Sequence, residues 1–164
     1  MAGELRFLDI LSALARHEVD FVVVGGVAAI LEGAPISTFD LDIVFHRTTE
    51  NNARLAAVLQ ELNASYKDPA GRHIVPDSMK LDSINVHLLR TDLGPLDLLS
   101  RVGRDLTYEA LLDRSIDYEV AGLQLKVLNL ETVIECKEIA DRDKDRAALP
   151  ILRRTLELKR SGDD

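Results

Sequence analysis

The hydrophobic pattern of the N-terminal half alternates between helical and extended periods. Apolar residues at three- and four-residue spacing predict an amphipathic helix over residues 4–17. A run of β-branched and aromatic residues, Phe21–Val24, predicts a buried strand, and Leu41–Phe45 predicts a second one. Between them Val27–Leu31 is expected to form a short helix, and residues 50–62 carry the apolar stripe of a longer helix.

The C-terminal half contains more extended segments. We predict strands at His73–Val75, Ile84–Leu89 and Leu96–Leu99, a helix at Thr107–Asp113, a hairpin of Ile116–Val120 with Leu123–Val127, a helix from an Asn129 cap to about Ala140, and a last helix after Asp143. Pro150 is expected to break or restart that last helix. The predicted fold class is α+β: one domain over residues 1–164, with a mixed β-sheet flanked by helices and a helical C-terminal segment at about 129–160.

Composition narrows the function classes. The net charge of −8 argues against non-specific binding of duplex nucleic acid, and 4% aromatic residues without Trp disfavour stacking of bases on an aromatic platform. The charge is uneven, with three basic and eight acidic residues in 1–50 against eight basic and five acidic residues in 137–160. This asymmetry suits a site for cations and phosphates, although a solvated amphipathic helix explains the same C-terminal charges.

Three further features bear on location. Cys136 is the single cysteine, which excludes an intramolecular disulfide and a zinc cluster and fits a reducing cytoplasm. The first ten residues lack the basic and apolar regions of a signal peptide. The longest apolar run, Phe21–Leu31, is too short to span a bilayer, so we expect a cytoplasmic protein without a membrane partner.

Candidate chemistry begins with Asp40 and Asp42. Residues i and i+2 of a strand point to the same face, so both carboxylates should project together at the start of the second predicted strand. Two such charges on an apolar strand repel each other, and a divalent cation such as Mg²⁺ or Mn²⁺ would relieve that repulsion. An isolated Asp-x-Asp is more often a turn residue followed by a solvent-facing carboxylate.

Gly25 and Gly26 stand where the first predicted strand gives way to a helix. Glycine lets the backbone approach a ligand closely, and the first amides of a helix attract phosphate. A strand–Gly-Gly–helix turn is also common as a purely structural connection without a ligand. Asp97 is the best candidate for a third carboxylate because it is the one charge within the apolar segment Leu96–Leu99.

The order of these groups resembles the signature of the nucleotidyltransferase superfamily, which has the polymerase-beta-like fold. Val24-Gly25-Gly26 is followed, after a thirteen-residue spacer, by Asp40-Leu41-Asp42-Ile43. The segment Cys136–Asp145 with Leu149-Pro150 resembles the Lys…Ala…Arg-x-Lys-Asp…Leu segment of small bacterial members. These members include abortive-infection toxins of toxin–antitoxin modules and uncharacterised relatives, and the similarity covers nearly the whole chain.

The resemblance implies an enzyme that transfers a nucleoside monophosphate from an NTP, with ATP as the expected nucleotide, to a hydroxyl. The acceptor would be an RNA such as tRNA, a protein or a small molecule, and a toxin would have an antitoxin partner. On these residues, Asp40, Asp42 and Asp97 would bind the metals, and Asp97 could accept the proton of the attacking hydroxyl. Gly25 and Gly26 would bind the β- and γ-phosphates. Lys137, Arg142 and Lys144 would lie near the triphosphate or the acceptor, and Asp145 would fix one of these basic groups.

Several alternatives stay open. Many active members carry Ser where Gly26 stands, so a hydroxyl contact would be lost unless Ser37 or Thr38 supplies one. The chain has little room for a separate acceptor-binding domain, so a catalytically silent nucleotide-binding module or a partner-dependent subunit is the main competing interpretation. A haloacid-dehalogenase-like phosphatase is disfavoured because the apolar run continues after the aspartate pair instead of preceding it.

Overall fold

A seven-stranded mixed sheet organises the domain in the computed structural model, which describes residues 2–162. The strand order is β3-β4-β5-β2-β1-β9-β8. The strands are β1 (Phe21–Val24), β2 (Leu41–Phe45), β3 (Ser65–Tyr66), β4 (Val86–Thr91), β5 (Gly94–Leu99), β8 (Ser115–Val120) and β9 (Leu123–Leu128). The pairs β2–β5 and β1–β9 are parallel and the others are antiparallel. A separate two-stranded ribbon joins β6 (Arg101–Val102) to β7 (Leu106–Thr107).

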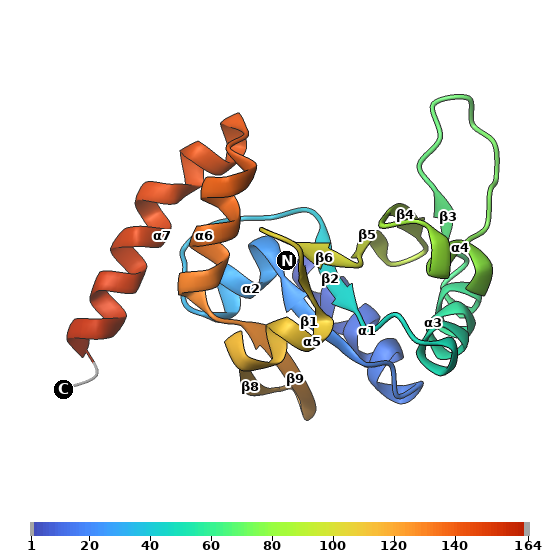
Figure 1. Cartoon of the computed structure of the whole chain (residues 1–164), viewed down its shortest axis with the longest axis horizontal. Helices are drawn as coiled ribbons and strands as arrows, with labels where there is room; N and C mark the ends of the chain where they lie inside the picture. The colour runs from blue at the N-terminus through green and yellow to red at the C-terminus, as the bar shows by residue number, and fades with distance from the viewer. Residues whose placement is uncertain (1, 163–164) are drawn as a thin grey trace.

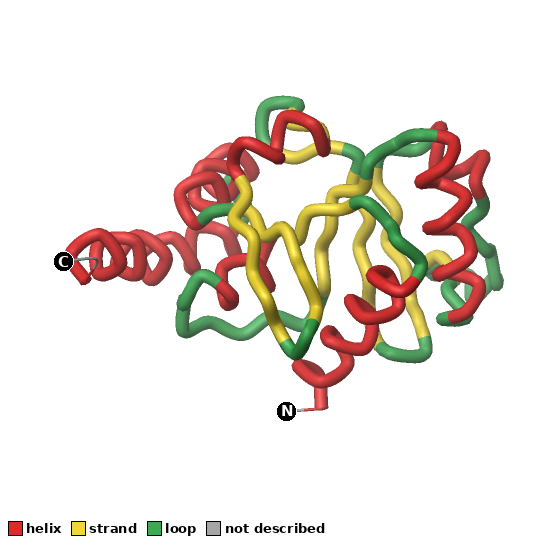
Figure 2. Tube along the Cα trace, turned by 90° about the horizontal axis from the view of Figure 1, so that it is seen from below, coloured by secondary structure: helices red, strands yellow, loops and turns green. Residues whose placement is uncertain are grey.

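Helices surround this sheet (Figure 1; Figure 2). They are α1 (Ala2–Arg16), α2 (Gly25–Leu31), α3 (Thr49–Glu61), α4 (Ser78–Ser83), α5 (Tyr108–Leu111) with the 3₁₀ turn η1 (Leu112–Arg114), α6 (Leu130–Ala140) and α7 (Asp143–Gly162). Helix α1 contacts α3, and α2 contacts α6. Helix α7 packs on α6 and then runs away from the sheet (Figure 1). None of the described helices is long and apolar enough to cross a membrane.

The two faces of β4 and β5 differ in burial, and this difference creates the open surface on which the site lies. His87 and Leu89 of β4 and Leu96 and Leu98 of β5 point to one face and are completely buried. The alternate residues of these strands point to the opposite face and are exposed or half-buried. The period of two along each strand therefore separates a core face from an open face.

Most sequence predictions of elements are confirmed. The α+β class with a mixed sheet is correct, and the hairpin across Ala121-Gly122 forms β8 and β9. Asn129 caps α6 as expected, because its side-chain oxygen accepts a hydrogen bond from the Thr132 amide at 2.8 Å. Helix α2 begins at Gly25 instead of Val27, directly at the end of β1.

The strand predicted at His73–Val75 is wrong. Residues 67–77 form a long loop between β3 and α4, which projects from the body of the domain (Figure 1). Within 73–75 a single backbone hydrogen bond, from Tyr66 N to Ile74 O at 2.9 Å, links the segment to β3. Gly71 and Pro76 flank the segment. The single hydrogen bond to Tyr66 is too little to make a β-ladder.

Two further boundaries differ from the predictions. The strand expected from Ile84 begins at Val86, because Asp77 caps the unpredicted helix α4, which ends just before Ile84. Pro150 neither breaks nor restarts the last helix, since α7 is continuous through it. Buried Leu149 and Leu152 lie on both sides of the proline, so packing of the apolar stripe outweighs the loss of one helical hydrogen bond.

Candidate active site

The predicted carboxylates Asp42 and Asp97 come together on the open face of the sheet. Strands β2 and β5 run parallel with Asp42 directly beside Asp97, so both side chains point to the same side. Their neighbours Leu41, Ile43 and Leu96 point the other way into the core. The alternation in the sequence is therefore what aims the two acids away from the core.

The surroundings of this pair favour a shared proton in the absence of a cation. Burial, the adjacent carboxylate of Asp97 and the charge of Asp40 together raise the pKa of Asp42 to about 7, although Lys144 opposes the shift. Burial also raises the pKa of Asp97. The Oδ1 atoms of Asp42 and Asp97 are both buried without a hydrogen-bond partner. Such orphaned oxygens are costly unless a proton or a cation satisfies them.

Asp40 lies at the edge of this pair. Its carboxylate is 3.9 Å from Lys67 Nζ, and its side chain is 38% exposed. It is near enough for its charge to raise the pKa values of both other acids. Among residues 2–162 no three Asp, Glu, His or Cys side chains already form a complete metal cage. Two of the three predicted acids thus converge fully, while the third faces a lysine.

Gly25 and Gly26 adjoin the acids from the β1 side. Val24, the last residue of β1, pairs with Asp42, and Gly25 then opens α2 with a φ of 65°. A Cβ atom on Gly25 would lie 2.4 Å from Asp42 Oδ2, so only glycine fits there. A Cβ atom on Gly26 would lie 2.8 Å from the Cβ of Thr38. Gly25 therefore lies directly against the Asp42 carboxylate, and Gly26 lies against Thr38.

The predicted basic residues divide into two groups. Buried Asp145 holds Lys137 Nζ at 3.4 Å and Arg142 Nε at 2.7 Å. Burial alone would raise the pKa of Asp145, but its hydrogen bonds with Arg142 lower it, so the acid stays charged. Asp145 thus fixes two of the basic groups. Lys144 is near enough to lower the pKa values of both Asp42 and Asp97.

Lys67 is a basic residue of the site that sequence reasoning missed. It follows the two-residue strand β3, and its amide donates to Leu88 O at 3.0 Å, so the pairing with β4 extends one residue beyond β3. The local sequence lacks an alternating pattern long enough to predict that strand. The only available signal was a lysine at the start of a Pro- and Gly-containing loop.

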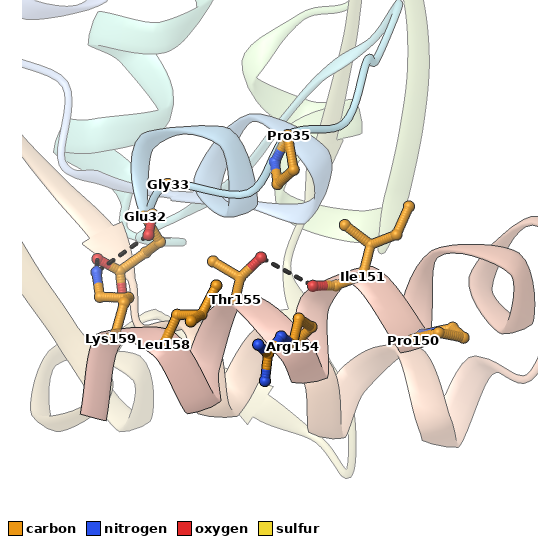
Figure 3. Close-up of a pocket in the computed structure, with 9 residues that line it drawn as sticks. All are labelled: Glu32, Gly33, Pro35, Pro150, Ile151, Arg154, Thr155, Leu158 and Lys159. Carbon is orange, nitrogen blue, oxygen red and sulfur yellow. Dashed lines mark hydrogen bonds and ion pairs between the residues drawn. The ribbon is translucent and has the colours of Figure 1, made fainter. Parts of the chain in front are cut away.

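A groove and a smaller pocket lie away from the acids. A groove of about 620 Å³ runs between α7 and the turn after α2 and is lined by Pro35, Ile151, Arg154 and Leu158 among others (Figure 3). At its end Lys159 Nζ contacts the buried carboxylate of Glu32 at 3.1 Å. This Glu32 also accepts hydrogen bonds from the Leu130 amide and from the hydroxyl of Tyr118. These contacts tie α7, α6 and β8 to the turn after α2.

Comparison with known proteins identifies the fold. No protein-family model and no curated protein matches the chain. A proposed nucleotidyltransferase from Thermotoga maritima is similar in structure, with a TM-score of 0.57 and 19% identity over 90% of this chain and 90% of that one. The chain has the nucleotidyltransferase fold, as the resemblance of its motifs predicted.

Two antibiotic-modifying proteins share this fold. The lincosamide antibiotic adenylyltransferase LnuA, solved with lincomycin bound, has a TM-score of 0.63 and 13% identity, with 92% of this chain and 96% of that chain covered. The antibiotic-resistance factor ANT(2'')-Ia, solved with adenylyl-2''-tobramycin, has a TM-score of 0.56 and 16% identity, with 90% and 85% covered. The chain thus spans nearly the full length of both structures.

Proposed function

We propose that this protein is a metal-dependent nucleotidyltransferase that moves a nucleoside monophosphate from an NTP, with ATP as the expected donor, to a hydroxyl acceptor. The observation that carries the proposal is the contact between two halves of one site. Gly25, the first residue of α2, lies directly against Asp42, and Asp42 is paired with Asp97. Amides for a triphosphate and carboxylates for its cations are the two requirements of phosphoryl transfer.

The residues fit a divalent cation. Asp42 and Asp97 each present a buried oxygen without a partner, and carboxylate oxygens are the ligands that Mg²⁺ and Mn²⁺ accept. Asp40 would join them by exchanging its ion pair with Lys67 for the cation. When bound, the cation supplies Lewis-acid stabilisation of the charge on the phosphate oxygens.

The chain's own residues would perform the remaining steps. The α2 amides at Gly25 and Gly26 would bind the β- and γ-phosphates, and Lys144 would add positive charge near the acids. The acceptor oxygen would form a bond to the α-phosphorus while the bond from the α-phosphorus to the bridging oxygen breaks. Pyrophosphate would leave with that oxygen, and Asp97 would accept the hydroxyl proton. Lys137 and Arg142, held by Asp145, would face the triphosphate or the acceptor.

The acceptor is proposed by analogy with the structural neighbours. LnuA was solved with lincomycin and ANT(2'')-Ia with an adenylylated tobramycin, so both handle small hydroxyl compounds. A small-molecule acceptor is therefore favoured over tRNA or protein for this chain. The toxin–antitoxin role and an antitoxin partner, which the C-terminal motif implies, stay predictions that an adjacent reading frame would support.

A labelling experiment tests this proposal. Purified protein with Mg²⁺ would be incubated with each of four NTPs, labelled at either the α- or the γ-phosphate, and with cell extract as the source of acceptors. The proposal predicts α-label in an acceptor and γ-label in pyrophosphate, both absent with Asp42→Asn. Transfer of γ-label to an acceptor would identify a kinase instead. NTP binding without any transfer would identify the silent nucleotide-binding module.

A further inference from the structure

The direction of in-line attack determines where an acceptor must lie. In phosphoryl transfer the attacking and leaving oxygens lie on opposite sides of the phosphorus. The proposed phosphate-binding amides at Gly25 and Gly26 lie on the β1 side of Asp42, because Val24 pairs with Asp42. The pyrophosphate would therefore leave toward β1. The acceptor hydroxyl would approach from the other side, where β5 and β4 lie.

The sheet register shows which side chains occupy that side. Asp42 of β2 pairs with Asp97 of β5, and Asp97 pairs with Leu88 of β4. The amide of Lys67 in turn donates to the Leu88 carbonyl. Directly paired residues on neighbouring strands point to the same face. Lys67, Leu88, Asp97 and Asp42 therefore form one row across the open face of the sheet.

This surface is apolar next to the carboxylates. Leu88 is 46% exposed and Val86, two residues earlier on the same face of β4, is 52% exposed. Their neighbours along β4, His87 and Leu89, are completely buried, so the strand itself is firmly packed. Phe39, directly before Asp40, is 85% exposed. Exposed apolar residues at a rigid strand beside a polar site are typical of a binding surface.

The charges on this surface do not suit a polynucleotide. Lys67 and Arg90 are the cations that the register places on the open side of β3 and β4. Lys67 is already paired with Asp40, and Asp42 and Asp97 add further negative charge. A protein surface that binds a nucleic acid needs several lysines or arginines to contact the phosphates of its backbone. The open face of β4 therefore offers exposed Val86 and Leu88 with one cation, Arg90, which is too little positive charge for a polynucleotide.

We propose that the open face of β4, formed by Val86 and Leu88, binds the acceptor, and that this acceptor is a small hydroxyl compound with an apolar surface beside its hydroxyl. The inference rests on the proposed function and deepens it by naming the acceptor class. Leu88 would hold the apolar part of the acceptor next to Asp97, which would receive the hydroxyl proton. An RNA would present ribose and phosphates beside its hydroxyl and would lack the apolar surface that fits Val86 and Leu88.

Methyl NMR of the full chain provides a test that does not depend on turnover. Protein with ¹³C-labelled Leu, Val and Ile methyl groups and ¹⁵N-labelled amides would be titrated first with Mg²⁺ and the non-cleavable analogue α,β-methylene-ATP. A series of aromatic and alicyclic alcohols would follow, and bulk tRNA would be titrated separately. We expect the alcohols to shift the methyl signals of Val86 and Leu88. Leu88→Ser should weaken their binding about fivefold, because serine removes the apolar contact that the exposed part of Leu88 would make with the alcohol.

Ile116→Ser is the matched control, because Ile116 is a 40% exposed strand residue on β8 at the other end of the sheet. It should leave alcohol binding unchanged. The inference is overturned if the alcohols shift no β4 methyl, or if tRNA shifts these methyls and the alcohols do not. A failure of the proposed function is distinguishable, because in that case the nucleotide analogue leaves the Gly25 and Gly26 amide signals unmoved.

Discussion

Replacing Asp42 by Asn should stabilise the cation-free protein, and more so as the pH rises. The folded pKa of Asp42 is raised to about 7 by burial and by its acidic neighbours. In the unfolded chain the same group has a pKa of about 3.9. The folded state thus holds a proton that the unfolded state has released, so stability is greatest below the unfolded pKa and falls until the pH passes the folded pKa. Asn imitates the protonated acid and does not titrate.

The size of the effect follows from the same two values. Between pH 5 and pH 7 the unfolded aspartate is already ionised while the folded one is still mostly protonated. Each pH unit in that interval costs about 1.4 kcal/mol of unfolding free energy. The advantage of Asp42→Asn over wild type should therefore grow by about 2 to 3 kcal/mol from pH 5 to pH 7 and level off above pH 8.

Urea unfolding of both proteins at pH 5, 6, 7 and 8 in the presence of EDTA measures this advantage directly. Comparing the two proteins at each pH cancels the titration of the groups that do not interact with Asp42. Asp117→Asn, at an exposed position of β8, serves as a control that should show no such growth. A difference between Asp42→Asn and wild type that is constant with pH would refute the electrostatic account of the site.

Two other substitutions test the packing around the site. Gly25→Ala should destabilise the protein by about 2 kcal/mol more than Gly122→Ala, because both positions have positive φ but only the Cβ at 25 would collide with Asp42. Equal losses in thermal unfolding would contradict the close approach. Asp145→Ala should cost about 3 kcal/mol because it removes a buried carboxylate and leaves the mostly buried Lys137 without its ion pair, whereas Asp143→Ala, on the exposed side of the same turn, should cost less than about 1 kcal/mol. Similar urea midpoints for these two variants would contradict the role of Asp145 in holding Lys137 and Arg142.

The sequence predicted the centre of the site better than its surroundings. Asp42 and Asp97 could be predicted because each is a lone charge in an apolar strand, and a strand with period two has one face for such a residue. Gly25 could be predicted because only a close approach or a positive φ makes glycine useful at the end of a buried strand. These are local properties, and the family signature is made of the same residues.

Long-range register was not predictable. Lys67 reaches Asp40 only because β3 pairs with β4 and β4 with β5, and a two-residue strand leaves no periodic signal. The row of Lys67, Leu88, Asp97 and Asp42 depends on the same register. Pro150 shows the opposite effect, since a reliable local signal for a helix break is overridden by the packing of α7 on α6.

The central claim is that the glycine turn and the carboxylates form one nucleotide site. Calorimetric titration with α,β-methylene-ATP tests it most directly, because the analogue binds without an acceptor and is not cleaved. Wild type should bind in the presence of Mg²⁺ and lose most of its affinity in EDTA. Both Gly25→Ala and Asp42→Asn should abolish the Mg²⁺-dependent binding, while Gly122→Ala should retain it. Equal binding by all four proteins, with or without Mg²⁺, would contradict the account.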